Sequence, residues 1–357
     1  MDDIADISAT PEWTLREAIR AFERNQKGIV VICDGAGCPV GTVNDGDIRR
    51  AMLHGGCLDD RLGVILEHKR GAGYDRPVTA PADASPLEWT KLMHDRVIHQ
   101  LPLVDRDGRL SGVVTLNELL PDRPAEARAV VMAGGFGTRL APLTHDTPKP
   151  MLPVGEKPLL EHIIAQVREA GVRDVNISTH YRPEKIRDHF EDGTRFGVNL
   201  NYLHEAEPQG TAGALRDLPV GDQPLLVING DILSRVDFQA MLAFHRSHDA
   251  RLTVGVRQYD VEVPYGVTEV IDGRVVALSE KPVYNFFVNA GIYVIEPGVL
   301  HRIPTSGRFD MTDLIGALIA GNELVVSFPI HEYWLDIGRH EDYCQAQRDF
   351  STAPQDS

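Results

Sequence analysis

The N-terminal third of the chain repeats itself without a gap at an offset of 71 residues, and this repeat restricts how that region can fold. The matched pairs are Ala18 with Trp89, Phe22 with Met93, Ile32 with Leu103, Asp34 with Asp105, Gly41 with Gly112, Val43 with Val114, Asp47 with Glu118 and Ile48 with Leu119. The two copies, about residues 8–60 and 78–122, each predict a helix, two strands separated by a turn, and the start of a second helix. Because one such unit cannot bury its sheet alone, we expect the copies to pack face to face.

The repeated unit resembles the CBS-domain pair. Copies in that family end in a small hydroxyl residue followed three positions later by Asp, which contacts the ribose hydroxyls of an adenine nucleotide. Asn44 and Asp47 occupy these positions in the first copy, and Thr115 and Glu118 occupy them in the second. The resemblance makes Asp47, Thr115 and Glu118 candidate ligands of an adenine or guanine nucleotide. The alternative is that the pair has a structural or dimerising role and binds no ligand. We also expect the protein to form a homo-oligomer.

The segment "PDRPAEAR", residues 121–128, contains two prolines and no apolar periodicity, which predicts a domain boundary. We expect domains over residues 1–122 and 129–350, joined by a linker at 123–128. After the boundary, strand signals such as "ARAVVMAG" alternate with helix signals such as "LLEHIIAQVREAG". This alternation predicts an α/β domain with a mainly parallel sheet, whose ligands bind at the carboxyl ends of the strands.

A glycine-rich turn, "AGGFGTRL", directly follows the first strand of the second half. Glycines at such a position let the backbone approach a phosphate and point its N–H groups at the anion. The turn is neither a dinucleotide fingerprint, because Leu140 would stand at the third glycine, nor a P-loop, because no Gly-Lys-Ser/Thr follows. A tight turn without a ligand is the alternative. Two nearby cations, Arg139 and Lys149, favour an anion-binding site.

Charge and cysteine usage exclude several classes of partner. The chain has 36 Lys and Arg against 52 Asp and Glu, a net charge of −16, which argues against a nucleic-acid partner. Its four cysteines form no CxxC pair, so neither a zinc site nor a disulfide framework is expected. The acidic N-terminus lacks a signal-peptide core, and no apolar run reaches membrane-spanning length. We therefore expect a cytoplasmic protein without a membrane partner.

Residues 132–154, "MAGGFGTRLAPLTHDTPKPMLPV", resemble the signature of sugar nucleotidyltransferases. The resemblance continues in order over about residues 129–345, through "EAEPQGTAGAL", "VINGD", "PYGV", "LSEKP", "VNAGIYV" and "WLDIG". It implies a Rossmann-like domain with a mainly parallel mixed sheet. It also implies that a sugar 1-phosphate attacks the α-phosphate of a nucleoside triphosphate, giving an NDP-sugar and pyrophosphate. No hexapeptide repeat follows, so we expect no acetyltransferase domain.

The resemblance carries roles over to individual positions. The implied catalytic residues are Arg139, Lys149, Asp231, Lys281 and Asp336. The implied nucleotide-binding residues are Ala133, Gly134, Gly135, Gly137, Thr138, Arg139, Glu205, Gly210 and Thr211. The implied sugar-phosphate ligands are Tyr265, Gly266, Glu280, Lys281 and Asn289.

Mg²⁺ is the expected cofactor, held by Asp231 and Asp336. Both residues follow apolar strand signals, and hard carboxylate oxygens suit this ion. The alternative for either Asp is a helix cap or a turn residue, and the alternative for Glu280 and Lys281 is a solvated pair.

Glu205 bears on which nucleotide is used. A carboxylate accepts the adjacent N1–H and N2–H₂ donors of guanine, whereas an amide suits uracil or thymine. We therefore expect GTP, with UTP, CTP and dTTP as alternatives, and a hexosamine, mannose or heptose 1-phosphate. A CBS pair in front resembles guanylyltransferases of surface-glycan biosynthesis. A non-catalytic nucleotide-sensing subunit is the alternative from another class.

Overall fold

The computed structural model describes residues 4–71, 76–96, 98–119, 125–219 and 221–351 of the 357-residue chain. The chain divides into two compact units, residues 1–123 and 124–357. The division falls inside the predicted linker, 123–128. Residues 123 and 124 of that linker lie outside the described residues, and the first strand of the second unit already begins at Arg128.

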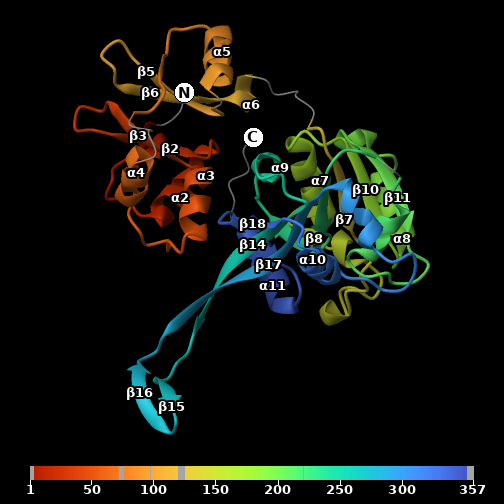
Figure 1. The fold of residues 1–357 in the computed structure, drawn as a ribbon. Helices are drawn as coiled ribbons and strands as arrows, with labels where there is room; N and C mark the ends of the chain where they lie inside the picture. The colour runs from red at the N-terminus through yellow and green to blue at the C-terminus, as the bar shows by residue number, and fades with distance from the viewer. Residues whose placement is uncertain (1–3, 72–75, 97, 120–124, 220, 352–357) are drawn as a thin grey trace. The chain divides into compact units, whose positions relative to one another are not determined.

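The N-terminal unit contains two similar α/β copies (Figure 1). The first copy comprises α1 (Ile4–Ile7), β1 (Ser8–Ala9), α2 (Leu15–Asn25), β2 (Ile29–Cys33), β3 (Pro39–Asn44), α3 (Asp45–Leu53) and α4 (Leu62–Gly71). The second comprises β4 (Ala80–Pro81), α5 (Pro86–Arg96), β5 (Gln100–Val104), β6 (Leu110–Thr115) and α6 (Leu116–Leu119). Each copy forms a three-stranded sheet, β1-β2-β3 or β4-β5-β6. The bounds of α5, β5 and β6 lie 71 residues after those of α2, β2 and β3, as the repeat predicts.

The two copies pack against one another, as expected. Ile29 and Val31 of β2 share a buried cluster with Leu110 and Val113 of β6. The ammonium of Lys27 donates to the carbonyl oxygen of Val113 at 2.6 Å. The contact buries apolar residues that each small sheet would otherwise expose.

The C-terminal unit alternates strands and helices over most of its length. Its main elements are β7 (Arg128–Met132), η1 (Thr138–Leu140), η2 (Lys149–Met151), β8 (Pro153–Val154), β9 (Lys157–Pro158), α7 (Leu159–Glu169), β10 (Asp174–Thr179), α8 (Pro183–Phe190), η3 (Thr194–Phe196), β11 (Asn199–His204), η4 (Gly213–Asp217), β12 (Leu225–Asn229), β13 (Ile232–Ser234), α9 (Phe238–Ser247), β14 (Leu252–Glu262), β15 (Val267–Ile271), β16 (Arg274–Ser279), β17 (Val283–Ile295), η5 (Pro297–Arg302), α10 (Met311–Ala320), β18 (Val325–Ile330), β19 (Trp334–Asp336) and α11 (His340–Ser351).

A seven-stranded sheet in the order β11-β10-β7-β12-β17-β14-β18 forms the centre of this unit. Strands β11, β10, β7 and β12 run parallel, and β14 and β18 also pair in parallel. Strand β17 is antiparallel to both of its neighbours, β12 and β14. The predicted mainly parallel mixed sheet is therefore confirmed.

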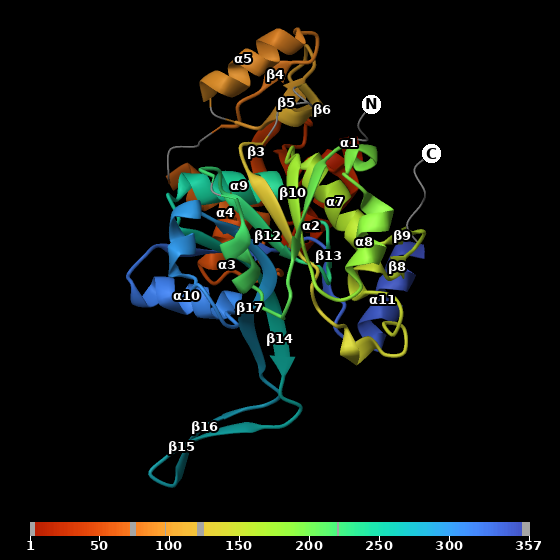
Figure 2. The same cartoon turned by 90° about the vertical axis from the view of Figure 1, so that its right-hand side faces the viewer.

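Alternate side chains of the central strands enter two different cores. Ala129 and Val131 of β7 pack with α7, α8 and α9, whereas Val130 packs with α10. Figure 2 shows α7 and α8 on one side of the sheet and α10 on the other. Because both faces are covered, residues 129–132 of β7 and 225–228 of β12 are all apolar rather than alternating with polar residues. Throughout the described ranges, no helix is both long enough and apolar enough to cross a bilayer.

Strands β14 and β17 extend beyond the sheet as a two-stranded ribbon, which ends in the β15–β16 hairpin (Figure 1). We call residues 257–287 of this extension the arm. Its outer strand segments are exposed, whereas the inner ends of β14 and β17 lie in the core. The arm is therefore a projection of a packed sheet rather than a loop.

Candidate functional site

The glycine-rich turn after β7 is closely packed against the segment that carries Lys149. Gly137 has φ of +63°, and a Cβ there would lie 2.9 Å from Thr144 Cγ2 and 3.0 Å from Lys149 Cβ. The Thr144 hydroxyl donates to the carbonyl oxygen of Gly137 at 2.8 Å. Both the backbone conformation and the crowding require glycine at this position. The turn thereby sets the place from which Lys149 extends.

Lys149 forms a partly buried ion pair with Asp231. Its Nζ lies 2.6 Å from Asp231 Oδ2, and the lysine is only 7% exposed. The flanking Pro148 and Pro150 hold the short η2 helix that presents it. Asp231 follows β12 at the carboxyl end of the parallel strands. Sequence reasoning identified both residues but did not predict that they pair.

Asp336 lies beside Asp231 because two short strands place it there. Strand β19 pairs antiparallel with β13, with Ile232 opposite Asp336. The backbone N–H of Ile337 donates to the carbonyl oxygen of Asp231 at 3.0 Å. Loss of hydration, followed by the nearby charge of Asp231, raises the pKa of Asp336. Two carboxylates thus meet at this edge of the sheet.

Arg139 completes a group of four charges. The cations of Lys149 and Arg139 act against the rise in the pKa of Asp336, which places both within electrostatic range of that carboxylate. Arg139 and Asp336 also approach the same glycine. A Cβ built on Gly338 would lie 3.7 Å from Arg139 Nη1 and 3.6 Å from Asp336 Oδ1. We call Arg139, Lys149, Asp231 and Asp336 the charge cluster. Sequence reasoning selected all four residues separately, and the structure brings them together.

Glu205 is buried beside the glycine-rich turn. It is 5% exposed, and a Cβ on Gly134 would lie 2.8 Å from its Oε1. The Ser178 hydroxyl donates to Oε1, and the Gln209 N–H donates to Oε2 at 2.9 Å. The backbone N–H of Ala133 donates to the Ser178 carbonyl at 3.0 Å. The carboxylate therefore adjoins the predicted nucleotide-binding turn and holds the loop that follows it.

That loop, residues 205–211, is anchored at its far end to the start of α10. The Thr211 N–H donates to Asp310 Oδ1 at 3.1 Å, and the Met311 N–H donates to Thr211 Oγ1 at 2.8 Å. Gly210 has φ of +85°, and a Cβ there would lie 2.6 Å from Asp310 Oδ1. Sequence reasoning missed Asp310. The three-residue spacing between Asp310 and Asp313, which is typical of a helix cap, could have indicated it. In the structure the two residues form a capping box.

Two of the remaining turn residues lie at its exposed side. Gly135 has open space where a Cβ would stand, and Thr138 begins η1. Neither is crowded by the surrounding protein, so both leave the turn accessible from outside.

Four of the five predicted sugar-phosphate ligands lie on the arm: Tyr265, Gly266, Glu280 and Lys281. Tyr265 is 74% exposed, and a Cβ on Gly266 would lie 3.1 Å from Glu280 Oε2. Lys281 has φ of +45°, an unfavourable backbone conformation for a residue with a side chain. In the described part of the chain, none of the four makes a hydrogen bond or ion pair with the charge cluster.

Asn289, the fifth predicted ligand, lies at the root of the arm and is linked to the charge cluster through Tyr293. Its Oδ1 accepts a hydrogen bond from the Gly291 N–H at 3.0 Å. Burial raises the pKa of Tyr293 to about 12, and Asn289 and Asp231 are the other groups that act on its hydroxyl. Sequence reasoning missed Tyr293, which is hidden in the apolar run of "VNAGIYV".

Asn229, at the end of β12, also escaped the sequence analysis. Its Oδ1 is buried and has no hydrogen-bond partner within the described residues. A Cβ on Gly291 would lie 2.7 Å from its Nδ2, so glycine is required beside it. An unpaired buried acceptor is costly unless something bonds to it. Its position two residues before Asp231 in "VINGD" was the available signal.

The candidate ligands of the N-terminal unit form helix caps. Asp47 is 4% exposed and accepts from the Asn44 N–H at 3.0 Å, from Lys69 Nζ at 2.7 Å and from the Arg50 guanidinium. Thr115 and Glu118 form the corresponding cap in the second copy, where Glu118 Oε2 accepts from the Thr115 N–H at 2.7 Å.

The second cap also joins the two copies. Lys27 Nζ lies 2.7 Å from Glu118 Oε1. The side chains that match the family's ribose-binding positions thus already have partners within the protein.

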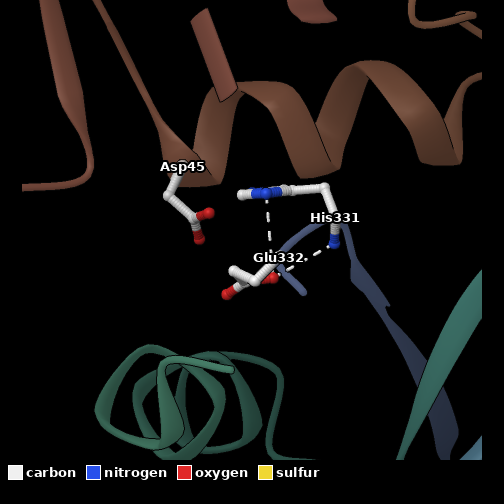
Figure 3. Close-up of side chains that lie close together, drawn as sticks. All are labelled: Asp45, His331 and Glu332. Atoms are coloured by element: carbon white, nitrogen blue, oxygen red, sulfur yellow. Dashed lines mark hydrogen bonds and ion pairs between the residues drawn. The ribbon is translucent and has the colours of Figure 1, made fainter. Parts of the chain in front are cut away.

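Two buried histidines of the C-terminal unit have local partners. His245 is 1% exposed, with Nδ1 2.8 Å from Thr253 Oγ1 and Nε2 3.1 Å from Glu296 Oε1. Burial lowers the pKa of His245. His331 follows β18, and its backbone N–H donates to Glu332 Oε2 at 3.1 Å (Figure 3). All four cysteines are free.

Comparison with known proteins agrees with this division of the chain. The nucleotidyl transferase family model matches residues 128–353, and the CBS domain model matches residues 3–54 and 74–121. Two relatives are a probable mannose-1-phosphate guanylyltransferase 2 of Oryza sativa subsp. japonica, 36% identical over 236 residues, and a mannose-1-phosphate guanylyltransferase of Mycobacterium tuberculosis, 35% identical over 230. Each alignment covers 62% of this chain and 64% of the relative, so less than two thirds of each relative is spanned.

Solved structures share the fold of the C-terminal unit. HddC from Yersinia pseudotuberculosis complexed with GMP-PN is 25% identical, with a TM-score of 0.50, and the match covers 62% of this chain and 99% of that one. A putative glucose-1-phosphate thymidylyltransferase from Bacillus anthracis, 24% identical with a TM-score of 0.53, shares the fold over 64% of this chain and 96% of its own. The chain belongs to the nucleotidyl transferase family and carries a pair of CBS domains in front of the family domain.

Proposed function

We propose that the chain transfers a nucleotidyl group from GTP to a sugar 1-phosphate, releasing pyrophosphate and forming a GDP-sugar. The observation that carries this proposal is the charge cluster beside the glycine-rich turn. Transfer at a phosphate requires positioning and neutralisation of charge rather than a protein nucleophile. Lys149 and Arg139 supply fixed positive charge, and the turn supplies backbone N–H groups.

The paired carboxylates fit a divalent cation, and we propose Mg²⁺. The supporting observation is electrostatic: burial, and after it the charge of Asp231, raises the pKa of Asp336, while Lys149 and Arg139 act in the opposite direction. Both offer the hard oxygen ligands that Mg²⁺ prefers. When bound, the ion would neutralise charge on the phosphates. Asp231 and Asp336 would hold it, and Lys149, released from part of its pairing, would face the phosphate oxygens.

GTP is favoured by Glu205 and by the relatives. Each carboxylate oxygen of Glu205 accepts one protein donor, and a carboxylate oxygen has capacity for two. The remaining capacity suits the two neighbouring donors of guanine. The relatives named as guanylyltransferases and the GMP-PN complex of HddC agree with this choice. A mannose 1-phosphate acceptor follows the same relatives, with hexosamine and heptose 1-phosphates as the alternatives.

We further infer that Tyr265, Gly266, Glu280, Lys281 and Asn289 bind the sugar phosphate. The unusual backbone of Lys281 supports this, because strained residues gather at functional sites.

For the N-terminal pair of CBS domains, the occupied helix caps at Asp47 and Glu118 favour a role in structure or assembly over nucleotide binding.

A pyrophosphate-release assay with four nucleoside triphosphates and a panel of mannose, glucosamine, glucose and heptose 1-phosphates tests the proposal. Turnover should be highest with GTP and should require a divalent cation. A chain that binds GTP but turns over none of these combinations would support the non-catalytic alternative. A clear preference for UTP or dTTP would contradict the role given to Glu205.

A further inference from the structure

The arm exposes an unusually large apolar surface. In the ladder, Tyr259 is opposite Phe286 and Val261 is opposite Tyr284, so these four side chains share one face. They are 58%, 54%, 39% and 43% exposed, respectively. Further along the arm, Val270, Ile271, Val275, Val276 and Leu278 are each more than half exposed.

The opposite face of the ribbon is more polar. It carries Gln258, Asp260 and Glu262 on β14, which lie opposite Phe287, Asn285 and Val283 on β17. A two-stranded ribbon with one apolar face is marginal in water, and large exposed apolar patches on a folded protein mark interaction surfaces. The apolar face of the arm therefore requires a partner surface.

The backbone ladder keeps the arm away from the sheet of its own chain. Pairing is unbroken from Val256 opposite Asn289 to Glu262 opposite Val283, and the Val263 N–H donates to the Pro282 carbonyl at 3.0 Å. Six residues of strand at about 3.3 Å each carry the end of the ribbon roughly 20 Å beyond the sheet.

Residues 265, 266, 280 and 281 stand at this end, where β14 and β17 meet the β15–β16 hairpin. To reach the charge cluster of the same chain, the arm would have to bend sharply at its root. The ladder at this root has a single register shift, between Val254 and Val256.

We propose that the arm docks on a second copy of this chain, so that Glu280 and Lys281 of one copy complete the charge cluster of the other. This inference rests on the proposed function, because it takes the sugar-phosphate ligands to be on the arm. A second copy carries the surface that Glu280 and Lys281 match. Its glycine-rich turn and charge cluster also lack a Glu280–Lys281 pair, because its own arm projects away from them. A two-fold exchange covers both arms at once and closes the assembly at a dimer.

Complementation between two inactive variants tests the exchange in the full-length protein. Asp231→Asn disables the cluster, and Lys281→Ala disables the arm. If the arm acts on the other copy, each mixed dimer has one site with an intact cluster and an intact arm. Random exchange then restores about a quarter of wild-type turnover, because half of the dimers are mixed and each has one working site. Asp231→Asn mixed with Asp336→Asn is the matched control, since both changes lie in the cluster and no site is complete.

Association provides a readout that does not depend on activity. Phe286→Asp should weaken dimerisation in sedimentation experiments at least tenfold, because it places a charge on the apolar face. Asn285→Asp adds the same charge on the opposite face of the same strand and should leave dimerisation within threefold of wild type.

The outcomes separate the two proposals. An active wild type without complementation would show that the arm serves its own chain and would overturn the exchange. A monomeric wild type, or equal association of Phe286→Asp and Asn285→Asp, would also overturn it. A wild type that dimerises through Phe286 but turns over no substrate would instead refute the proposed function.

Discussion

Lys149 offers the sharpest test of the charge cluster, because its charge can be removed while its shape is nearly kept. Lys149→Met retains the aliphatic stem that packs near Gly137 and Thr144 but loses the ammonium group. The substitution leaves Asp231 without its partner at 2.6 Å and still beside Asp336. The change therefore affects both stability and the proposed chemistry, and the two effects differ in size.

The stability cost follows from burial. Breaking a fully buried ion pair costs about 3–5 kcal/mol, but the Asp231 side chain is 31% exposed and water can partly replace the lysine. We therefore expect the free energy of unfolding to fall by about 1–2 kcal/mol. Loss of a fixed charge at a reacting phosphate should lower kcat more, by about 10²–10³-fold, equivalent to roughly 3–4 kcal/mol.

Urea unfolding and pyrophosphate-release kinetics measure these two quantities separately. Lys157→Met is the matched control, since its side chain is 59% exposed and its ammonium lies 3.5 Å from Glu161. It should change both quantities little. A Lys149→Met enzyme with kcat within threefold of wild type would refute the assigned role. A double-mutant cycle with Asp231→Asn should give a coupling energy above about 0.5 kcal/mol in stability, and additive effects would show that the pair does not interact.

Four further predictions follow from particular contacts. Asp336→Asn should nearly abolish Mg²⁺-dependent turnover, whereas Asp342→Asn should retain most of it; equal losses in a Mg²⁺ titration would argue against Asp336 as a ligand. Glu205→Gln should reduce kcat/KM for GTP by about 5- to 150-fold, because an amide offers guanine only one acceptor. The kcat/KM values for UTP and dTTP should change less. Unchanged selectivity among the four triphosphates would contradict this. Burial lowers the pKa of His245, so as pH falls below about 6.5 the unfolded chain binds a proton before the folded chain does. The free energy of unfolding should therefore decrease in this range. Urea titrations at pH 5–7.5 should show a weaker decrease for a His245→Gln protein. Calorimetry of the full chain with AMP, ATP and GTP should give the same heats for wild type and Asp47→Asn if that carboxylate serves only as a cap; a nucleotide affinity lost in the variant would show that it is a ligand.

Local sequence determined the elements and the order of the two domains. The 71-residue offset predicted the paired copies, because a repeated pattern of apolar residues forms the same helix and strands each time. The alternating strand and helix signals predicted a mainly parallel sheet, and the "AGGFGTRL" turn predicted where the charges would lie. These features depend on residues that are close in the chain, so their periodicity and spacing are readable without coordinates.

Long-range pairing decided what the local pattern left open. Asn44 and Asp47 match both a ribose-binding spacing and a helix cap. The hydrogen bonds between these two residues show that the cap is formed, and the ammonium of Lys69, 22 residues further along the chain, occupies the same carboxylate. Lys149 and Asp231 are 82 residues apart, and their pairing depends on how the glycine-rich turn packs against β12.

The arm shows the same limit. The motifs "PYGV" and "LSEKP" predict sugar ligands, but strand pairing alone determines that β14 and β17 hold them beyond the sheet. A motif specifies which side chains are available for the chemistry, whereas their distances depend on backbone hydrogen bonds between residues far apart in sequence.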